Sequence, residues 1–549
     1  MKLFLPILLV VSQFTFAQPR FQFKIQFLDK DSGYYSVENP EGFLSSRAIK
    51  RRQRQGIEIT QQDLPVCSTY IQGVKVIGNL EIRSISKWFN DMVIEVGDSS
   101  FIKKIRDLDY VESATLIPAD YTKVAEIQFD KLVVKQGLNH EKGYEHFGSS
   151  FNQAHMLGCD YLHEIGNRGE GMLIAVIDAG FTAVPDHAFL GDLWIDKRII
   201  ATRDFVDKDD QVYAHSNHGM YVLTTLAAYL PGNMVGTAPK ASYLLLRSED
   251  GAAEYILEEY FWVEAAEFAD SAGADVLNTS LGYTIFDDSI QDHALKDLDG
   301  NTTRISQAAR ISALKGMLVF NSAGNSGNNS WGKIGAPADA ENIVAVGAVN
   351  ALKEIATFSS RGPSSDGRIK PELCAMGNDV VIGNPDGTAR SSNGTSFSSP
   401  VLSGMAACLW QSNPDATWQE IRNALIASAD RHFNPDTNYG YGIPNAILAE
   451  SILKKNPLVA EGEGNWIQLS PNPFSDKLIG TYSSSENAKM NITFIDMTGR
   501  KVNESEQWIR ASEGGFFCIR ANDLPGSTGT YIVEFRIGNN TQRLKVVKR

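Results

Sequence analysis

The chain has few cysteines and, after its first residues, no long apolar segment. Its five cysteines lie at positions 67, 159, 374, 408 and 518, too sparse for a disulfide scaffold and too scattered for a zinc site. The odd number leaves at least one thiol unpaired within the chain. No later segment approaches the roughly 18 uninterrupted apolar residues of a membrane-spanning helix. We therefore expect no transmembrane span.

Positive charge is also in deficit. The 51 lysines and arginines against 65 acidic residues give a formal net charge of -14. Nucleic acids and anionic membranes attract clustered positive charge, so neither is expected as the main partner. The 549 residues exceed what one hydrophobic core usually organises, which predicts several domains.

The N-terminus has the features of an export signal. Lys2 precedes an apolar run from Leu3 to Val11, and Thr15-Phe16-Ala17 forms a small-x-small site before Gln18. We predict a cleaved signal peptide over residues 1–17. The mature protein is then secreted or attached to the cell surface.

Residues 18–140 are expected to form a small α+β unit, with strands over Phe21–Leu28, Val74–Ile77 and Asp91–Val96 and a helix over Phe43–Arg54. The helix carries a basic cluster that is compatible with nucleic acid binding or a processing site. All of its members except Arg52 recur at helical spacing, which favours a solvated helix face. They are Arg47, Lys50, Arg51, Arg52 and Arg54.

From residue 141 to 455, strand-like runs alternate with helical stretches, which predicts an α/β domain with a parallel sheet and helices on both faces. The strands are expected over Met172–Ile177, Tyr243–Leu246, Val276–Asn278, Met317–Asn321 and Ile343–Val346. Residues 456–465 have the composition of a linker. Residues 466–549 alternate in the β sense between turn signals and predict a small all-β sandwich.

Three polar residues of this middle region lie at the boundaries of predicted strands and helices. Asp178 ends an apolar strand, His218 opens a helix, and Ser396 begins a helix that contains Pro400 in what we expect to be its first turn. A serine nucleophile, a histidine base and an orienting carboxylate are what acyl transfer from a peptide needs. His215 is the alternative base, but no glycine and helix follow it.

The same chemistry requires donors for an oxyanion. Asn325, in a glycine-rich loop after a strand, offers a side-chain amide, and the backbone amide of Ser396 is the second donor. Taken singly, these residues are compatible with structural capping and turn roles. All four together, in this order, predict a catalytic site.

These segments resemble the subtilisin-like serine proteases, also called subtilases. The chain order Asp, His, Ser matches that family, and the segment Asn-Gly-Thr-Ser-x-x-x-Pro around Ser396 is its most specific mark. The resemblance runs from about Gly166 to Leu448. Further matching segments are Gly236-Thr237-Ala238-Pro239, Ser280-Leu281-Gly282, Phe358-Ser359-Ser360-Arg361-Gly362-Pro363 and Lys370-Pro371-Glu372. Met220 and Tyr221 replace the threonine and second histidine that usually follow the catalytic histidine, a departure that concerns local packing.

The resemblance implies the substrate contacts. Main-chain groups of Ser280, Leu281 and Gly282 would pair with extended protein or peptide substrates. Ser322, Ala323 and Gly324 would border the primary pocket together with Gly335, and these small uncharged residues indicate no preference for a basic side chain. No cofactor is required for the chemistry. Relatives often bind structural Ca²⁺, but no loop identifies a metal site, and Asp207–Asp210 fits a solvated acidic turn better.

The flanking regions resemble known accessory domains. Residues 18–140 resemble a subtilase propeptide, which implies an intramolecular inhibitor and folding aid that is removed by self-cleavage between about Pro118 and Lys142. The last region resembles the type IX secretion sorting domain of Bacteroidetes, which implies the type IX machinery as a partner; an accessory β domain that binds substrate or carbohydrate is the alternative. The residues that carry this second resemblance are Leu469-Ser470-Pro471-Asn472-Pro473-Phe474, Ile495-Asp496-Met497-Thr498-Gly499-Arg500, Gly529-Thr530-Tyr531 and Lys545–Arg549.

Two other functions are compatible with a serine-centred site. One is a catalytically dead surface-binding protein, whose expected sign is the loss of a triad residue. The other is an esterase or lipase, which would show Gly-x-Ser-x-Gly and the order Ser, Asp, His. Neither pattern is found. Among the cysteines, Cys408 is expected in the core, and Cys159 and Cys374 are a candidate disulfide pair.

Overall fold

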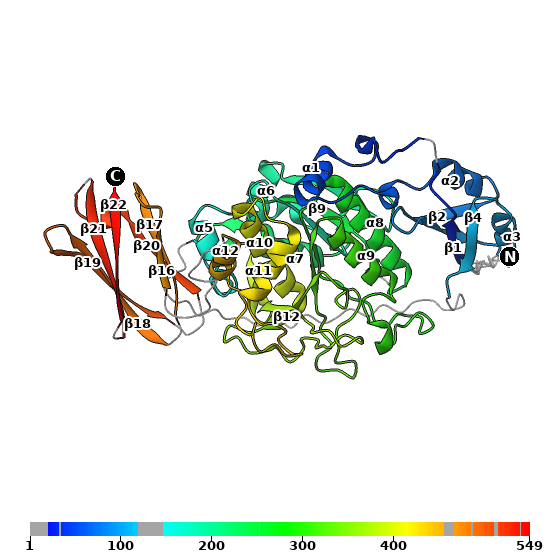
Figure 1. The fold of residues 1–549 in the computed structure, drawn as a ribbon. Helices are drawn as coiled ribbons and strands as arrows, with labels where there is room; N and C mark the ends of the chain where they lie inside the picture. The colour runs from blue at the N-terminus through cyan, green and yellow to red at the C-terminus, as the bar shows by residue number, and fades with distance from the viewer. Residues whose placement is uncertain are drawn as a thin grey trace, which may run out of the picture.

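The computed structural model describes residues 20–31, 34–118, 146–251, 253–454, 466–484, 487–509, 514–526, 528–538 and 540–549. The predicted signal peptide, nearly all of the predicted processing stretch and the predicted linker lie outside the described residues. Three parts follow one another along the molecule, with the largest in the middle and a smaller one at each end (Figure 1).

The N-terminal part is an α+β unit, as expected. Its antiparallel sheet has the order β2-β3-β1-β4 and is covered by two helices. The elements are β1 (Phe21–Phe27), α2 (Ser68–Lys75), β2 (Leu80–Ser86), β3 (Asp91–Val96), α3 (Phe101–Arg106) and β4 (Val111–Leu116). The strand predicted over Val74–Ile77 is wrong, because Tyr70, Ile71 and Val74 face the core at helical spacing in α2.

A long segment between β1 and α2 carries the basic cluster. It contains η1 (Pro40–Gly42), α1 (Ser46–Gln55) and η2 (Gln61–Asp63). The prediction of a solvated helix face is wrong, because Arg51 and Arg52 are only 2% and 0% exposed and pair with Asp270 of the middle part. Periodic spacing places Arg51 on one helix face with Arg47 and Arg54 but does not show whether water or a carboxylate covers that face.

A seven-stranded sheet forms the centre of the middle part, and every neighbouring pair of strands in it is parallel. Its order is β13-β12-β11-β10-β5-β9-β6. The strands are β5 (Leu173–Asp178), β6 (Ile199–Asp204), β9 (Ser242–Arg247), β10 (Val276–Thr279), β11 (Leu318–Ser322), β12 (Val344–Val349) and β13 (Leu373–Met376). The five strands predicted for this region are confirmed to within a few residues. Two hairpins accompany the sheet, β7 (Tyr229–Leu230) with β8 (Met234–Val235) and β14 (Val380–Gly383) with β15 (Ala389–Ser392).

Helices cover both faces of this sheet, as expected for its near-continuous apolar strands. In Figure 1, α10, α11 and α12 lie to one side of it and α8 and α9 to the other. The longer helices are α7 (His218–Ala227), α8 (Leu257–Ala272), α9 (Arg304–Leu314), α10 (Thr395–Ser412), α11 (Trp418–Ala427) and α12 (Ala446–Leu453). Shorter ones are α4 (Phe151–His155), α5 (Cys159–Glu164), α6 (Gly191–Ile195), η3 (Val184–Asp186), η4 (Ala188–Leu190) and η5 (Leu295–Asp297).

The C-terminal part is all-β, as predicted. One sheet has the order β16-β17-β20 and the other β19-β18-β21-β22, and they share a core of their own. The strands are β16 (Trp466–Ser470), β17 (Lys477–Ser483), β18 (Ala488–Asp496), β19 (Lys501–Ile509), β20 (Gly514–Arg520), β21 (Gly529–Ile537) and β22 (Asn540–Lys548), with η6 (Ala521–Asp523) before β21. This part contacts the middle part through the ion pair of Lys477 with Glu164.

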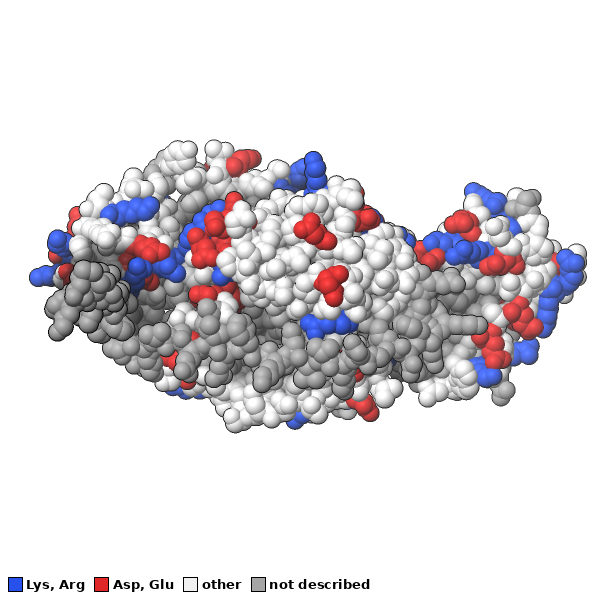
Figure 2. All heavy atoms as spheres, turned by 180° about the vertical axis from the view of Figure 1, so that it is seen from behind, with Lys and Arg blue, Asp and Glu red and all other residues white. Residues whose placement is uncertain are grey.

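The five cysteines are free, and Cys408 is in the core as expected. The candidate pairing of Cys159 with Cys374 is not found: the Cys159 and Cys408 thiols both donate to Thr237 O, and Cys374 donates to Tyr439 O. Seen from behind, charged side chains of both signs gather over the two end parts, and the face of the middle part is mostly uncharged (Figure 2). Within the described ranges, no helix has the length and apolar character needed to cross a bilayer.

Candidate active site

The carboxyl ends of three adjacent parallel strands bring the predicted site residues to one edge of the sheet. Asp178 is the last residue of β5, Ser280 directly follows β10, and Ser322 is the last residue of β11. These strands are neighbours in the order β11-β10-β5. Clefts outside the carboxyl ends of such strands are where open α/β sheets bind their ligands.

Asp178 and His218 form a hydrogen-bonded pair. His218 Nδ1 lies 2.7 Å from Asp178 Oδ1, and the same oxygen accepts a 2.8 Å hydrogen bond from the backbone amide of Ala179. Asp178 is fully buried at the strand end, and His218 is held at the first position of α7. Gly219 makes this approach feasible, because a Cβ there would lie 2.5 Å from Gly180 O.

The surroundings of His218 favour the protonated form of its imidazole. Burial by itself lowers the pKa of His218, but the charge and hydrogen bond of Asp178 outweigh burial and raise that pKa above its usual value. The more distant Glu249 carboxylate acts in the same direction. A partly exposed histidine with a buried carboxylate on Nδ1 presents Nε2 as its free nitrogen.

Ser396 is the second residue of α10, and Pro400 is the sixth, so the expectation of Pro400 in the first turn is wrong. A residue at position 400 would normally donate its amide hydrogen to the carbonyl of Ser396, four residues earlier, and proline has none. Ser280 Oγ supplies this hydrogen bond instead, at 2.9 Å from Ser396 O. The end of β10 is thereby joined to the helix turn that carries the serine.

The Ser396 hydroxyl is 3.4 Å from Ser280 O, a long hydrogen bond. No hydrogen bond between Ser396 and His218 occurs among the described side chains. The His218 ring nevertheless lies beside this helix turn, with its centroid 6.3 Å from that of Phe397. Hydrogen bonds of catalytic groups commonly tighten only when substrate binds.

Asn325 is fixed by a residue that the sequence analysis did not select. The backbone amide and the hydroxyl of Thr395 both donate to Asn325 Oδ1, each at 3.0 Å. Thr395 Oγ1 also accepts from the amide of Gly324 at 3.2 Å. Thr395, the residue directly before Ser396, thus fixes the Oδ1 side of the Asn325 amide.

The segments predicted to border the substrate cleft also lie close together. Gly324, with φ of +101°, turns the loop after β11, and Ala323 packs in one small apolar cluster with Ile334. Tyr283, just after Ser280–Gly282, exchanges two backbone hydrogen bonds with Ala336. A Cβ at Gly335 would lie 3.2 Å from Tyr283 O.

The alternative base His215 is not paired with Asp178. Its Nε2 lies 3.5 Å from Asp204 and 3.6 Å from Asp207, and Arg247 Nη1 reaches the same two carboxylates at 2.6 and 2.7 Å. A guanidinium thus occupies the place between them, and an imidazole is a poor calcium ligand. These residues do not fit a calcium site.

A second acidic group was missed by sequence reasoning. Glu249, Glu254 and Glu258 bring carboxylate oxygens within 4.8 Å of one another. Burial raises the pKa of Glu249 to about 7 and that of Glu254 to about 8, so this group holds protons at neutral pH. Glu249 accepts hydrogen bonds from Tyr283 and Ser248, and two backbone amides donate to Glu258. The carboxylates of Glu249 and Glu258 are thus already held by protein donors.

Comparison with known proteins agrees with this geometry. Residues 169–442 match the model of the subtilase family. The middle part is a subtilase domain. Residues 22–131 match the Peptidase S8 propeptide domain of Bacteroidota, and residues 468–549 match a secretion system C-terminal sorting domain.

Curated relatives of the subtilase domain come from bacilli. The chain is 30% identical to the thermophilic serine proteinase of Bacillus sp. (strain AK1) over 53% of its own length and 64% of the relative's. It is 29% identical to the serine protease AprX of Bacillus subtilis over 51% of the chain and 66% of AprX. Subtilisin DY of Bacillus licheniformis is 29% identical over 54% of the chain and 96% of that protein. The chain therefore spans just under two thirds of the first two relatives and nearly all of the third.

Proposed function

We propose that this chain is a secreted serine endopeptidase that hydrolyses internal peptide bonds of proteins. The observation that carries the proposal is the Asp178–His218 pair at the sheet edge, next to the helix start that holds Ser396. The subtilase domain and its serine protease relatives support the same reaction class.

In the proposed reaction, Ser396 Oγ attacks the scissile carbonyl while His218 Nε2 accepts the hydroxyl proton. Asp178 holds the ring and stabilises the imidazolium that forms. Asn325 Nδ2 and the Ser396 amide donate to the oxyanion. His218 then protonates the leaving amine, and water hydrolyses the acyl-enzyme by the same steps. These steps use only protein groups and water.

Substrate would lie extended across the cleft. Main-chain groups of Ser280, Leu281 and Gly282 would pair with it, which gives affinity without strong sequence choice. Ser322, Ala323, Gly324 and Gly335 would border the primary pocket. Their small, uncharged side chains leave room for a bulky apolar residue before the cut.

The two flanking domains indicate how the enzyme is kept inactive, matured and secreted. We infer that the propeptide domain inhibits the enzyme until self-cleavage between about Pro118 and Lys142 releases it, and that the sorting domain directs secretion by the type IX machinery to the surface or medium. The last described residue of the propeptide, Pro118, already lies on the subtilase domain, where Gln291 Nε2 donates to its carbonyl at 2.9 Å.

The test is turnover of denatured casein by purified processed protein, beside Ser396→Ala and the control Ser398→Ala, whose hydroxyl only bonds to Thr395 O. A fluorophosphonate probe marks an activated serine. We expect turnover and labelling in wild type and control and neither in Ser396→Ala, whose chain should also stay full-length when expressed alone.

Other outcomes separate the alternatives. Hydrolysis of esters without casein turnover would indicate an esterase. A folded, processed wild type that neither labels nor cleaves would indicate a binding protein that has kept the fold.

A further inference from the structure

Besides the hydrogen bond of Pro118 with Gln291, two groups of described propeptide residues contact the subtilase domain. The first contact is made by the loop between β2 and β3, where Glu267 of α8 accepts hydrogen bonds from Ser86 Oγ at 2.6 Å and from the amides of Lys87 and Trp88 at 2.9 Å. The second is made by the segment between β1 and α2. We call residues Pro40–Leu64 of that segment the arm.

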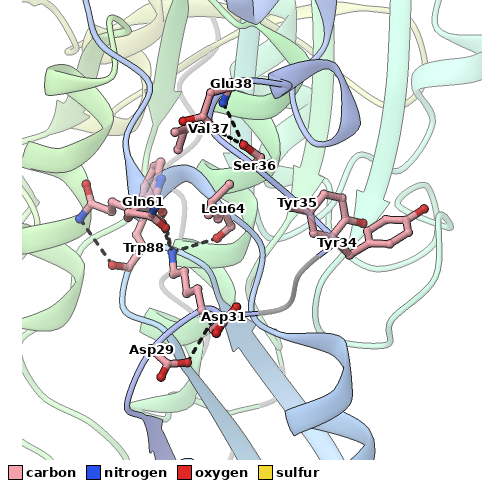
Figure 3. A pocket seen from close by; sticks show the side chains of 12 residues that line it. Asp29, Asp31, Tyr34, Tyr35, Ser36, Val37, Glu38, Gln61, Leu64 and Trp88 are labelled. Carbon is pink, nitrogen blue, oxygen red and sulfur yellow. Dashed lines mark hydrogen bonds between the residues drawn. The ribbon is translucent and has the colours of Figure 1, made fainter.

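Lys30 joins the C-terminal end of the arm to the first contact. Its ammonium donates to the carbonyls of Gln61, Gln62 and Leu64, each at 2.9 Å, and to Lys87 O at 2.5 Å. Figure 3 shows this region, where a cavity of about 810 Å³ lies between the residues that precede the arm and the end of the arm. Lys30 therefore holds the C-terminal end of the arm against the loop between β2 and β3.

Helix α1 of the arm reaches the edge of the sheet opposite the candidate active site. Helix α1 lies against the C-terminal end of α8, and Ser45 N donates to Ser271 O at 2.9 Å. Asp275, which pairs with Arg47 and Arg54, directly precedes β10 and accepts from the amide of Leu173 at the start of β5. These are the amino ends of the strands whose carboxyl ends carry the site.

A buried ionic network holds this second contact together. Asp270 is fully buried and is reached by Arg51 at 2.5 Å and by Arg52 at 2.8 Å. Arg52 also pairs with Asp63 of the arm at 3.0 Å, and Lys315 of the subtilase domain pairs with Asp63 at 2.8 Å. Each domain thus inserts charges of both signs, and each charge is paired across the boundary.

The arginines also bind the carbonyls of the two residues directly after α8, where the helix dipole favours cations. Arg47 Nε donates to Gly273 O at 2.9 Å, and Arg51 donates to Ala274 O. The surface around them is shaped for the arm, because a Cβ at Gly273 would lie 2.6 Å from Ala48 N, and one at Gly316 would lie 2.9 Å from Ile57.

Breaking one side of such a network leaves a buried charge without a partner, which is strongly unfavourable. Burial also limits screening by salt. Although burial alone would raise the pKa of Asp270, the surrounding arginines and lysines hold that pKa far below its usual value, so mild acid does not neutralise the carboxylate.

We propose that the arm is a second docking site of the propeptide domain, in which an acidic socket of Asp270 and Asp275 binds the arginines of α1. The arm keeps the propeptide domain bound after the chain between the two domains has been cut. The proposal deepens the inhibitory role given to the propeptide above. Its binding surface is remote from Ser396, so substrate-like contacts at the site and arm contacts act independently.

The test uses the full chain with Ser396→Ala and a recognition sequence for an added site-specific protease inserted within residues 118–142. Cutting then does not depend on the chain's own activity, so failure of the proposed hydrolysis leaves the test intact. After cutting, size-exclusion chromatography and a dissociation time course at 0.5 M NaCl measure how much propeptide domain stays with the subtilase domain.

We expect the parent to elute as one complex and the double variant Arg51→Leu, Arg52→Leu to lose its propeptide domain about 100-fold faster or more. Lys50→Ala, on the exposed side of the same helix, is the matched control and should behave as the parent. Arg47→Gln, a half-exposed position, provides a second variant if the double variant does not fold, and should dissociate measurably faster.

Two results would overturn the proposal. One is release of the propeptide domain from the parent immediately after cutting. The other is equal retention in the parent and in folded Arg51→Leu, Arg52→Leu or Arg47→Gln variants.

Discussion

Replacing Thr395 by valine is expected to weaken catalysis chiefly through Asn325. The Thr395 hydroxyl donates to Asn325 Oδ1 at 3.0 Å and accepts from the Gly324 amide at 3.2 Å. Valine keeps the shape and β-branching of threonine but makes neither hydrogen bond. The backbone amide of residue 395 still donates to Asn325, so the asparagine is loosened and not released.

The expected loss follows from these contacts. Each lost hydrogen bond contributes about 1 kcal/mol, which gives a total of about 1–2 kcal/mol or about a 5- to 30-fold decrease in kcat. The upper bound is complete loss of the oxyanion amide, which costs about 10²- to 10³-fold in kcat; that value was measured for subtilisin, a member of this same family. Because the Asn325 donor acts on the oxyanion, the loss of its support should appear in kcat, whereas any change in KM reports on the lost bond to Gly324 at the pocket.

The assay is steady-state hydrolysis of a peptide substrate by wild type, Thr395→Val and Thr395→Ser. Serine keeps the hydroxyl and should restore kcat to within about twofold. Unchanged kcat in Thr395→Val would refute the positioning argument, and so would an equal loss in the serine variant. A fall in thermal stability of both variants without any change in kcat would assign Thr395 a purely structural role.

Three further predictions concern the site and the propeptide contact. Asp178→Asn should lower kcat on the order of 10⁴-fold. In wild type, the raised pKa of His218 should place the acidic fall in kcat/KM above pH 6.5, because the base must be neutral. A fall centred at or below pH 6.5 in the pH–rate profile would contradict the ion pair. Ser280→Ala removes the hydroxyl that donates to Ser396 O, so the free energy of unfolding in urea should fall by about 1–3 kcal/mol; unchanged stability would show that the carbonyl finds another partner. Burial raises the pKa of Glu267 from 4.5 to about 7, and in the freed domain this carboxyl would be solvated and return to its usual pKa. The bound state then takes up more protons, so this contact is strongest below pH 4.5 and weakens as the pH rises towards 7, which dissociation rates of the cut chain at pH 5 and pH 8 would check. Glu267→Gln should reduce the difference, and the neighbouring Glu264, whose pKa burial also raises, accounts for part of what is left.

Much of the fold is local information that the sequence already contains. The strands of the central sheet are short apolar runs followed by turn or helix signals, and the predicted ends fall within a few residues of those found. The order Asp178, His218, Ser396 and the segments around them selected residues that the structure brings to one sheet edge, because carboxyl ends of adjacent parallel strands meet there. The flanking α+β and all-β parts follow from composition and periodicity in the same way.

The contacts between distant segments were decided only by the tertiary structure. Helical spacing placed Arg51 on one face with Arg47 and Arg54, but only the packing of α1 against α8 brings Arg51 and Arg52 to the buried Asp270. Pro400 could be recognised as a helix residue from the sequence. The hydrogen bond from Ser280 to the Ser396 carbonyl, which Pro400 leaves without its helical donor, joins two segments 116 positions apart and could not be recognised in this way. Spacing along a chain determines which side chains share a face, whereas the partner of a buried charge or carbonyl is set by the packing of segments far apart in sequence.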